Sequence, residues 1–339
     1  MNATEIVLPG AVEPEDLQVS TRELPEPEPD QAVVRVEATG VSFAEQQMRR
    51  GKYYDQPSFP FVPGYDLVGV VERLGDRADG DLAIGQRVAA LTKTGGWADR
   101  VVLDAAELVP VPRGVDAAAA ETVVVNGVTA LRMLRSARVQ RGQTIVVLGA
   151  AGGVGSTLVQ VARDAGIRVI GTAGPSAQER VRELGAIPVD YRNDDVPAHV
   201  CELAPDGVAA VFDHVGGPRI VDSWRMLARG GTLVSYGTAS TRDVPGNPRL
   251  PVLKLLARLT LWNVLPNGRR ATFFNLWAGA RKRDRYRADL RRDLGDVLRL
   301  LQQGAIDAQI AKRFPLRDAG EALRYAEQGG IVGKVVLEP

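Results

Sequence analysis

The sequence predicts an α/β protein in which a β-rich, barrel-like part precedes a doubly wound parallel sheet. Two observations lead to this prediction. Before residue 117, short apolar runs are separated by turns rich in Pro and Gly, as in a compact β domain. From residue 144 onward, apolar strand-like runs alternate with helix-like segments, which is typical of βαβ units with helices on both faces of the sheet.

The β-rich part has recognisable strands and turns. Its strands are expected at residues 32–38, 66–74, 86–91 and 99–103, with turn signals at 25–30, 60–64 and 75–80. Two helices are expected next, over 117–121 and 127–136.

The alternating part follows from residue 144. Its strands are expected at 144–148, 168–172, 188–191, 208–213 and 232–236, and its helices at 155–165, 177–184 and 219–227. After Gly237 the pattern is weaker. It suggests a loop at 242–251, an unusually apolar helix at 253–264, a strand at 272–277, helices at 281–303 and 316–328, and a closing strand at 333–337.

Length and composition restrict the class of protein. The 339 residues are enough for two domains, and 45% hydrophobic with 24% charged residues is ordinary for a globular protein. A net charge of +1 gives no reason to expect a nucleic-acid partner. The lone Cys201 cannot form an internal disulfide, so a reducing, cytoplasmic location is expected. Its side chain is expected to be packed and unreactive. The first residues lack the features of a signal peptide, and the apolar stretch 250–265 is interrupted by Lys254 and Arg258, so no stable membrane insertion is expected.

Metal chemistry is not expected from this composition. The chain has two histidines, His199 and His214, and a single cysteine. A structural zinc site needs about four Cys or His ligands and a catalytic site about three ligands, including carboxylates. No ligand-like spacing occurs, so we expect no metal and a zinc-independent reaction.

A glycine-rich turn at residues 149–155 is the strongest functional signal. It joins the apolar run 144–148 to a helical segment without a gap, which is the arrangement that places a phosphate at the positive end of a helix. Gly152 would let the backbone approach a pyrophosphate and Gly155 would let the helix pack on the strand. The alternative is that these glycines only make a tight turn. The predicted contacts are Ala151, Gly152, Gly153, Val154 and Gly155.

The end of the second strand favours NADPH over NADH. Enzymes that use NAD commonly have Asp or Glu here, but this chain has Gly171 to Gly174 and its next acid is Glu179. A 2′-phosphate would therefore meet no repelling carboxylate. The predicted hydrogen-bond donors are Thr172 and Ser176, and Gly174 is expected to contact the cofactor as well. Arg180 or Arg192 would supply positive charge, with a solvated helix face as the alternative role of Arg180.

Seven segments carry a resemblance to a known family. They are residues 41–45 with 50–53, 61–66 with 69–71, 95–98, 125–130, 150–155, 212–217 and 332–337. In this order and spacing they resemble the zinc-free medium-chain dehydrogenases/reductases, in the branch of quinone oxidoreductase (zeta-crystallin) and the vesicle amine transport protein 1 group.

The resemblance implies a fold and an activity. It implies a GroES-like β-barrel catalytic domain, residues 1–124 and 276–339, and a Rossmann NADPH-binding domain, residues 125–275. The implied activity is NADPH-dependent reduction of quinones or α,β-unsaturated carbonyls (enones) by a homodimer. A second enzyme class, an enoyl-thioester reductase, and a nucleotide-binding protein with a structural or membrane-associated role are the alternatives.

The resemblance also implies roles for single residues. Asn126 and Thr129 would lie near the nicotinamide, with Asn126 fixing a helix start or the ribose. Tyr191 would flank the adenosine phosphate. The remaining contacts it implies along the dinucleotide are Val215, Gly216, Tyr236, Gly237, Phe274, Leu276 and Lys334. The chain departs from many relatives at Ser42, where they have Asn, and from some at Gln178, where they have Lys.

The expected reaction is hydride transfer from the reduced nicotinamide, and it needs a hydrogen-bond donor near the acceptor oxygen. The candidate donors are Tyr53, Ser42 and Thr129, with Tyr54 competing with Tyr53. His214 is either an acid or a structural residue. The segment 253–277 is interpreted as core, subunit interface or a lid over an apolar substrate.

Overall fold

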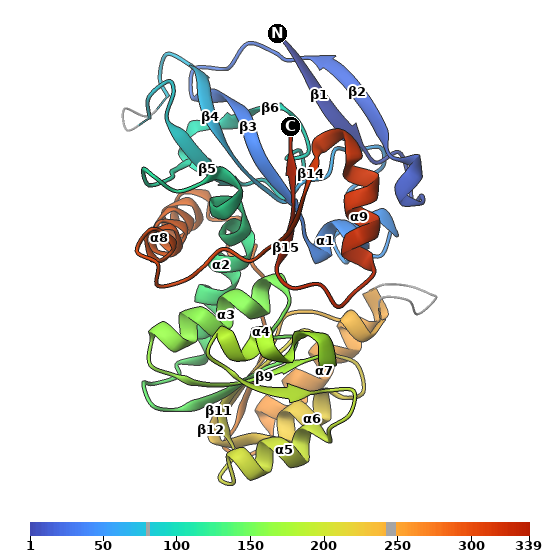
Figure 1. Ribbon diagram of the computed structural model, residues 1–339, viewed down its shortest axis with the longest axis vertical. Coiled ribbons are helices and arrows are strands. Elements are labelled where there is room, and N and C mark those ends of the chain that lie inside the picture. The colour runs from blue at the N-terminus through green and yellow to red at the C-terminus, as the bar shows by residue number, and fades with distance from the viewer. Residues whose placement is uncertain (79–81, 242–248) are drawn as a thin grey trace. The chain divides into compact units, whose positions relative to one another are not determined.

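The computed structural model describes residues 1–78, 82–241 and 249–339, and the chain divides into two compact units (Figure 1). Unit 1 comprises Met1–Val128 and Gly279–Pro339, and unit 2 comprises Thr129–Ala278. The domain boundaries expected from the sequence, at residues 124/125 and 275/276, lie a few residues before these limits.

Unit 1 is built on a seven-stranded sheet in which β3 is central. The order is β14-β15-β3-β4-β5-β7, and β6 also pairs with β3. Most neighbours are antiparallel, but β14 and β15 are parallel. The strands are β3 (Gln31–Val41), β4 (Asp66–Leu74), β5 (Arg87–Leu91), β6 (Arg100–Asp104), β7 (Val109–Pro110), β14 (Ile310–Pro315) and β15 (Lys334–Glu338).

A separate antiparallel pair, β1 (Asn2–Val7) and β2 (Gln18–Glu23), was not expected from the sequence. Strand β2 is exposed along most of its length, so it lacks the apolar alternation of a half-buried strand. The turn signal at residues 75–80 extends into residues outside the described part of the chain.

Helices complete the core of unit 1. The helix α8 (Arg283–Gln302) buries Leu290, Leu294, Val297 and Leu298, which fall on one helical face. The helix α9 (Ala319–Glu327) packs beside β15. The short helix α1 (Phe43–Arg49) follows β3.

The helix α2 (Ala117–Ala137) is continuous, which corrects the expectation of two helices. Asp116 accepts a hydrogen bond from Ala119 N at 3.0 Å and so caps its start. Gly127 suggested a break, but a Cβ there would lie 2.3 Å from Val297 Cγ1, so this glycine serves close packing against α8. Among the described residues, α2 is long and apolar enough to cross a membrane, yet 83% of its apolar 18-residue stretch is buried in the protein, as in a core helix.

A buried ion cluster ties three distant parts of unit 1 together. The Lys334 ammonium on β15 donates to both carboxylate oxygens of Asp66 on β4, at 2.8 and 2.7 Å, and to Glu121 on α2. All three side chains are almost fully buried. Burial opposes the charge on Lys334, but the two carboxylates together raise its pKa above the usual range. A Cβ at Gly40 would lie 2.3 Å from Glu121 Oε1, so β3 needs glycine beside the cluster.

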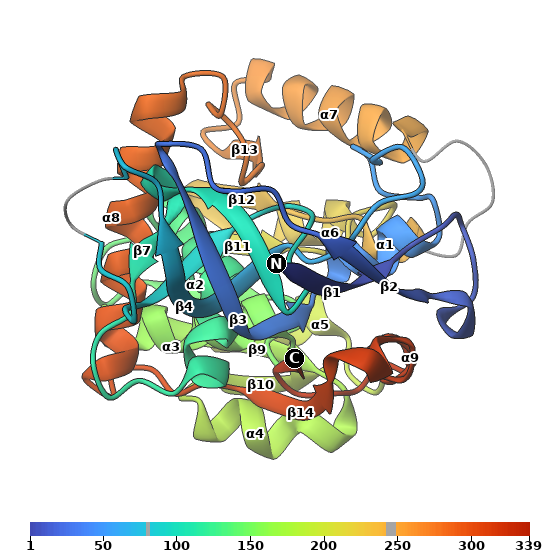
Figure 2. The same cartoon turned by 90° about the horizontal axis from the view of Figure 1, so that it is seen from above.

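Unit 2 is a six-stranded sheet in which every pair of neighbours is parallel. The order is β10-β9-β8-β11-β12-β13, and Figure 2 shows the strands following one another from β10 near α4 to β13 near α7. The doubly wound sheet expected from the sequence is therefore confirmed. The strands are β8 (Thr144–Val147), β9 (Arg168–Ala173), β10 (Ile187–Asp190), β11 (Val208–Asp213), β12 (Leu227–Ser235) and β13 (Arg270–Phe273).

The helices of unit 2 connect these strands. They are α3 (Gly153–Asp164), α4 (Gln178–Glu183), α5 (Val196–Leu203), α6 (Ile220–Arg225) and α7 (Arg249–Val264). Most of the loop expected at 242–251 lies outside the described residues, and its last three residues begin α7. Cys201 is exposed on α5, which corrects the expectation that it is packed.

We predict that Lys334→Met destabilises the protein by about 3–5 kcal/mol, because it leaves two buried carboxylates without their counter-charge. Burial raises the pKa of Glu121. In the folded variant this carboxyl group would therefore keep its proton at a pH at which the unfolded chain has already lost it. The loss of stability should therefore be smaller at pH 5 than at pH 8.

Urea unfolding at both pH values measures this effect. The exposed Lys312→Met is the matched control and should change stability little. A loss for Lys334→Met that is equal at pH 5 and pH 8 would contradict the assignment.

Candidate functional site

The glycine-rich turn connects β8 to α3, and its glycines let the start of α3 pack closely against the end of β8. Gly152 is the N-cap of α3, with extended backbone at φ −70° and ψ 168°. A Cβ at Gly155 would lie 2.1 Å from Gly149 O, so only glycine lets the helix approach the strand this closely. Among the described residues, a Cβ at Gly152 would meet only Gly149 O, at 3.5 Å, so these residues leave room for a side chain at the start of the helix. The first-turn N–H groups of Gly153, Val154 and Gly155 have no earlier helical carbonyl to bind.

A second loop meets this turn at the switch point of the sheet. In the order β10-β9-β8-β11-β12-β13, the chain proceeds from β8 to β9 and β10 in one direction and from β11 to β12 and β13 in the other. The point between β8 and β11, where the direction changes, is where dinucleotides bind in such sheets. His214, just after β11, lies against Gly149: a Cβ on that glycine would be 2.4 Å from His214 Cε1. Burial lowers the pKa of His214, which keeps the imidazole neutral, and its Nδ1 is buried with no partner among the described residues.

The carboxylate of Asp213 shapes that second loop. It accepts hydrogen bonds from Val215 N and Gly216 N, both at 2.8 Å, and from Ser223 Oγ at 2.7 Å. Gly216 adopts φ +63°, a conformation that favours glycine. The loop therefore presents Val215 and Gly216 in a fixed geometry beside the glycine-rich turn.

At the end of β9, two of the residues expected to contact the 2′-phosphate already have partners within the protein. The Thr172 hydroxyl is buried and accepts from Gly149 N at 3.1 Å, so it supports the turn rather than standing free. Arg180 pairs with Glu183 at 2.6 Å along α4. Arg192, in contrast, lies beside Gly174, since its Nε would be 3.8 Å from a Cβ at that position.

The other residues expected near the adenosine end are also placed by the structure. The Tyr191 hydroxyl lies close to Gly174, at 3.6 Å from the position of a Cβ, and Ser176 is exposed in the short helix that follows. Gln178 donates to the carbonyl of Ala173 at 2.7 Å. The end of β9 itself carries no acid, and Tyr191 and Arg192 lie beside Gly174. The neighbouring acid on β10 is Asp190, the partner of Ala173, and it accepts from Arg192 N at 2.9 Å.

The ends of β12 and β13 supply the remaining expected contacts in unit 2. Tyr236 N donates to Asp213 O at 2.9 Å, and Phe274 N donates to Ser235 O at 2.8 Å. Gly237 faces His214, because a Cβ there would lie 2.8 Å from His214 O. Leu276 is buried, and its carbonyl accepts from Arg132 at 3.4 Å. These segments follow the carboxyl ends of neighbouring parallel strands, the edge where such sheets bind ligands.

The candidate catalytic residues belong to both units. Tyr53 is buried in unit 1, and its hydroxyl is 2.9 Å from that of Tyr65. Burial raises the pKa of Tyr53, so the phenol keeps its proton and can donate a hydrogen bond. Thr129 is the first residue of unit 2 and lies within α2.

Ser42 is not the free donor that the sequence suggested. It caps α1: its oxygen accepts from Ala44 N at 3.1 Å, and its hydroxyl donates to Glu45. Glu45 in turn accepts from Tyr65 N at 2.7 Å, and burial raises its pKa. The pattern Ser-x-x-Glu at residues 42–45 is a capping box, so this role could have been inferred from the sequence.

Two further expectations are corrected by the structure. Asn126 does not fix a helix start, since it lies inside α2 and donates to Thr122 O at 3.0 Å. Lys334 is not available to a dinucleotide, because its ammonium is buried between Asp66 and Glu121. The partner of Asn126 is four residues earlier on the same helix, whereas those of Lys334 are more than 200 residues away in the sequence.

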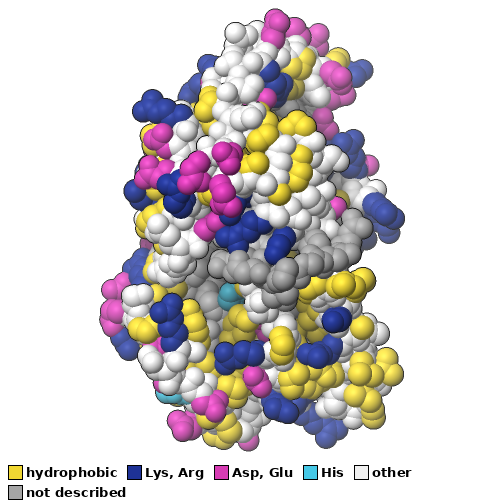
Figure 3. Space-filling view, turned by 90° about the vertical axis from the view of Figure 1, so that its right-hand side faces the viewer, with side chains coloured by type: hydrophobic (Ala, Val, Ile, Leu, Met, Phe, Trp, Pro, Cys, Tyr) yellow, Lys and Arg dark blue, Asp and Glu magenta, His cyan; other side chains and the backbone are white. Residues whose placement is uncertain are grey.

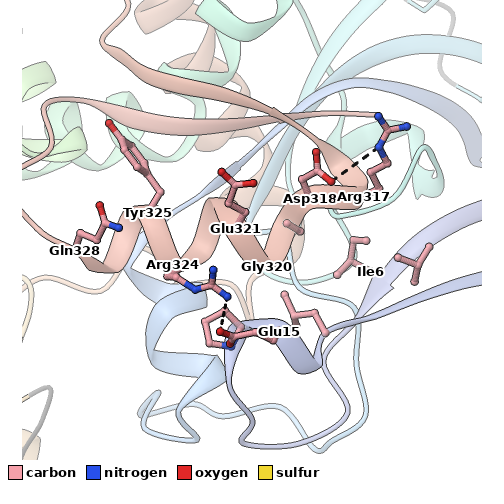
Figure 4. Close-up of a pocket in the computed structure, with 13 residues that line it drawn as sticks. Ile6, Glu15, Arg317, Asp318, Gly320, Glu321, Arg324, Tyr325 and Gln328 are labelled. Carbon is pink, nitrogen blue, oxygen red and sulfur yellow. Dashed lines mark hydrogen bonds and ion pairs between the residues drawn. The ribbon is translucent and has the colours of Figure 1, made fainter.

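A cavity of about 480 Å³ in unit 1 is unrelated to these residues. Figure 4 shows Glu15 and Arg324 facing each other across it, joined by an ion pair. Arg317 and Asp318 also pair with each other, at 3.9 Å. Its charges are mutually compensated, so we assign it no catalytic role. In the described part of the chain, no group of three or more His, Cys, Asp or Glu side chains is arranged to hold a metal.

Two described families match parts of the chain. Residues 28–113 match the alcohol dehydrogenase GroES-like domain, and residues 184–337 match the zinc-binding dehydrogenases. The chain is 32% identical over 226 residues to a probable quinone oxidoreductase from Schizosaccharomyces pombe, covering 66% of this chain and 68% of that protein. It is 33% identical over 242 residues to the human synaptic vesicle membrane protein VAT-1 homolog, covering 70% of this chain and 60% of that protein. The chain thus spans about three fifths of the VAT-1 relative.

Solved structures are similar over the whole chain. A mycobacterial protein complexed with NADPH has a TM-score of 0.84 at 29% identity, covering 99% of this chain and 100% of that one. A quinone oxidoreductase from Pseudomonas syringae has a TM-score of 0.85 at 29% identity, with the same coverage.

We predict that Gly152→Asp abolishes dinucleotide binding without unfolding the protein. The extended backbone and the open space at Gly152 accept a side chain, and Asp is a favourable N-cap. Its carboxylate would repel a pyrophosphate at the helix start, so the affinity for NADPH should fall by at least about 100-fold while the melting temperature is retained.

Titration calorimetry and thermal unfolding test this prediction together. Gly152→Asn has the same shape without the charge and should lose less affinity. Unchanged NADPH affinity in Gly152→Asp would remove the turn from the site.

Proposed function

This chain belongs to the medium-chain dehydrogenase/reductase family, in the branch of the quinone oxidoreductases and VAT-1 proteins, and we propose that it is an NADPH-dependent oxidoreductase that reduces a quinone or an enone. The observation that carries this proposal is the open glycine-rich turn at the switch point of a parallel sheet. The similarity to a probable quinone oxidoreductase supports the substrate class.

The residues of unit 2 fit a phosphorylated dinucleotide. The start of α3 offers unpaired N–H groups to the pyrophosphate, and the positive end of the helix dipole favours its charge. The end of β9 carries no acid, and Arg192 beside Gly174 is the residue we assign to the 2′-phosphate. A mycobacterial structure that is 29% identical to this chain is complexed with NADPH, which supports NADPH as the coenzyme.

NADPH would supply the hydride, and the protein would orient the acceptor and stabilise its developing charge. We assign the hydrogen bond to the acceptor oxygen to Tyr53, whose phenol remains protonated in its buried setting. Tyr65 holds that hydroxyl from the other side, and Glu45 fixes the backbone of Tyr65. We assign the nicotinamide contact to Thr129.

We propose that the reaction needs no zinc and that the enzyme is a homodimer. A catalytic zinc takes about three protein ligands, and the described residues provide no such group. The outermost strand β13 pairs with β12 on one side, and a second copy would pair with its other edge. Metal analysis of the active enzyme and its mass in solution test both points.

We predict that Arg192→Ala raises the dissociation constant of NADPH by about 10- to 100-fold, the effect of losing one charge-assisted hydrogen bond. Its affinity for NADH, which lacks the 2′-phosphate, should stay unchanged. Fluorescence titration with both coenzymes measures the difference. Arg182→Ala, on the exposed face of α4, is the matched control. Equal losses for NADPH and NADH would contradict the role of Arg192.

We predict that Tyr53→Phe lowers kcat by about 10- to 100-fold and leaves the NADPH affinity unchanged, because the phenol contributes mainly in the transition state. Steady-state kinetics with a quinone acceptor measure the effect. Tyr65→Phe removes only the partner of this hydroxyl and should have the smaller effect. A rate for Tyr53→Phe equal to that of the wild type would exclude Tyr53 from the reaction.

Oxidation of NADPH in the presence of a panel of acceptors tests the substrate class. We expect turnover with quinones or simple enones. A preference for enoyl-CoA would identify an enoyl-thioester reductase instead. Tight NADPH binding without turnover on any acceptor would indicate a nucleotide-binding protein with another role.

A further inference from the structure

The imidazole of His214 in unit 2 is a titratable group that the proposed reaction does not use. Its ring fills the space beside Gly149, where a Cβ would lie 2.4 Å from His214 Cε1, and its centroid is 6.0 Å from that of the Tyr236 ring. The chain has only one other histidine, and on the face that Figure 3 shows, histidine side chains contribute only small cyan areas to the surface. These contacts hold the imidazole among the ends of β8, β11 and β12.

The hydrogen bonds of His214 leave one of its two nitrogens without a partner. The carbonyl of Leu148 accepts a hydrogen bond from the imidazole, whereas Nδ1 is buried with no partner among the described residues. The proton is therefore on Nε2, and Nδ1 carries a lone pair. Burial also lowers the pKa of His214, which favours this neutral form. A buried acceptor without a donor costs free energy, so this position suits a ligand that donates a hydrogen bond.

The position of β11 in the sheet indicates which part of NADPH would reach this nitrogen. The glycine-rich turn after β8 faces the pyrophosphate, and β9, on one side of β8, ends at the residues assigned to the 2′-phosphate of the adenosine. The strand β11 pairs with β8 on the other side. The nicotinamide half of the dinucleotide would leave the pyrophosphate in that direction. The hydroxyl groups of its ribose are the first hydrogen-bond donors on that side.

We propose that Nδ1 of His214 accepts a hydrogen bond from a hydroxyl group of the nicotinamide ribose of NADPH. This inference rests on the proposed function and assigns a coenzyme-binding residue to it. The imidazole lies against Gly149 and is bonded to Leu148, at the start of the turn that faces the pyrophosphate. The ribose and the pyrophosphate would thus be held by adjoining parts of one packed structure. Fixing the sugar orients the nicotinamide ring that it carries, and hydride transfer depends on that orientation.

The same arrangement argues against His214 as the acid of the reaction. Its one proton is already donated to the carbonyl of Leu148, and Nδ1 has none to give. Of the two roles that the sequence left open, acid or structural residue, the structure favours neither alone. The imidazole is an acceptor whose proton is kept in place by the backbone.

Substitution of His214 tests the proposal with two ligands. His214→Phe keeps a ring beside Gly149 but removes the acceptor, so the dissociation constant of NADPH should rise about 3- to 10-fold, the effect of one neutral hydrogen bond. Adenosine 2′,5′-bisphosphate lacks the nicotinamide ribose, and its affinity should stay unchanged. In His214→Asn the amide oxygen takes the place of Nδ1 as an acceptor, so most of the NADPH affinity should return. His199→Phe, at the other histidine of unit 2, is the matched control.

Titration calorimetry measures both ligands, and melting temperatures confirm that each variant is folded. NADPH affinity in His214→Phe equal to that of the wild type would overturn the assignment while leaving the proposed function intact. Equal losses for NADPH and the bisphosphate would also overturn it, because the ring would then act only through the shape of the turn. A wild-type protein that does not bind NADPH would refute the proposed function together with this inference.

Nitrogen-15 spectra of the histidine side chains observe the bond in the unsubstituted protein. The chain has two histidines, so His199→Gln identifies the signals of His214. We expect saturating NADPH to move the Nδ1 signal of His214 upfield, as it does when a lone pair accepts a hydrogen bond, and the bisphosphate to leave it in place. An Nδ1 signal that NADPH does not move would overturn the proposal without reference to any variant.

Discussion

The close approach of α3 to β8 is the constraint on which the rest of unit 2 depends. Gly155 must stay without a Cβ because Gly149 O would lie 2.1 Å from it, and Gly149 must do so because His214 fills that space. A side chain at Gly155 would push the helix away from the sheet, and a side chain at Gly149 would displace His214 and the loop that carries it. The same contact brings the loop after β11 against the loop after β8, so one packing requirement both closes the core and forms the phosphate-binding end of the fold.

Much of unit 2 could be predicted from the sequence because its information is local. The central strands β8 and β11 are continuous or nearly continuous apolar runs, and each is followed by a turn with glycine. Unit 1 is different, since its strands pair across long separations: β3 pairs with β4, β6 and β15. The pair β1 and β2 was missed because most of its side chains are exposed, and α2 was divided in two because Gly127 suggests a break that packing against α8 makes unnecessary.

The parts of the candidate site that bind through backbone groups can be predicted from the sequence. The glycine-rich turn and the loop at 213–217 need particular residues to adopt their conformations, so the residues themselves reveal them. Side chains were harder to assign. Arg180 and Arg192 look equivalent in the sequence, but only the structure shows that one pairs with Glu183 and the other lies beside Gly174. The sequence does not reveal the roles of Glu45 and Tyr65, because the path of the irregular segment between α1 and β4 brings Tyr65 to Tyr53 and to Glu45.

The ion cluster of unit 1 also has a consequence for how the protein is made. Asp66 and Glu121 leave the ribosome long before Lys334, which follows Glu121 by 213 residues. Until Lys334 has been synthesised, the carboxylates have no cation to accompany them into the interior, and β15 is missing from the sheet. The residues of unit 2, Thr129–Ala278, are all made before β15, so unit 2 can fold on the nascent chain before the sheet of unit 1 is complete.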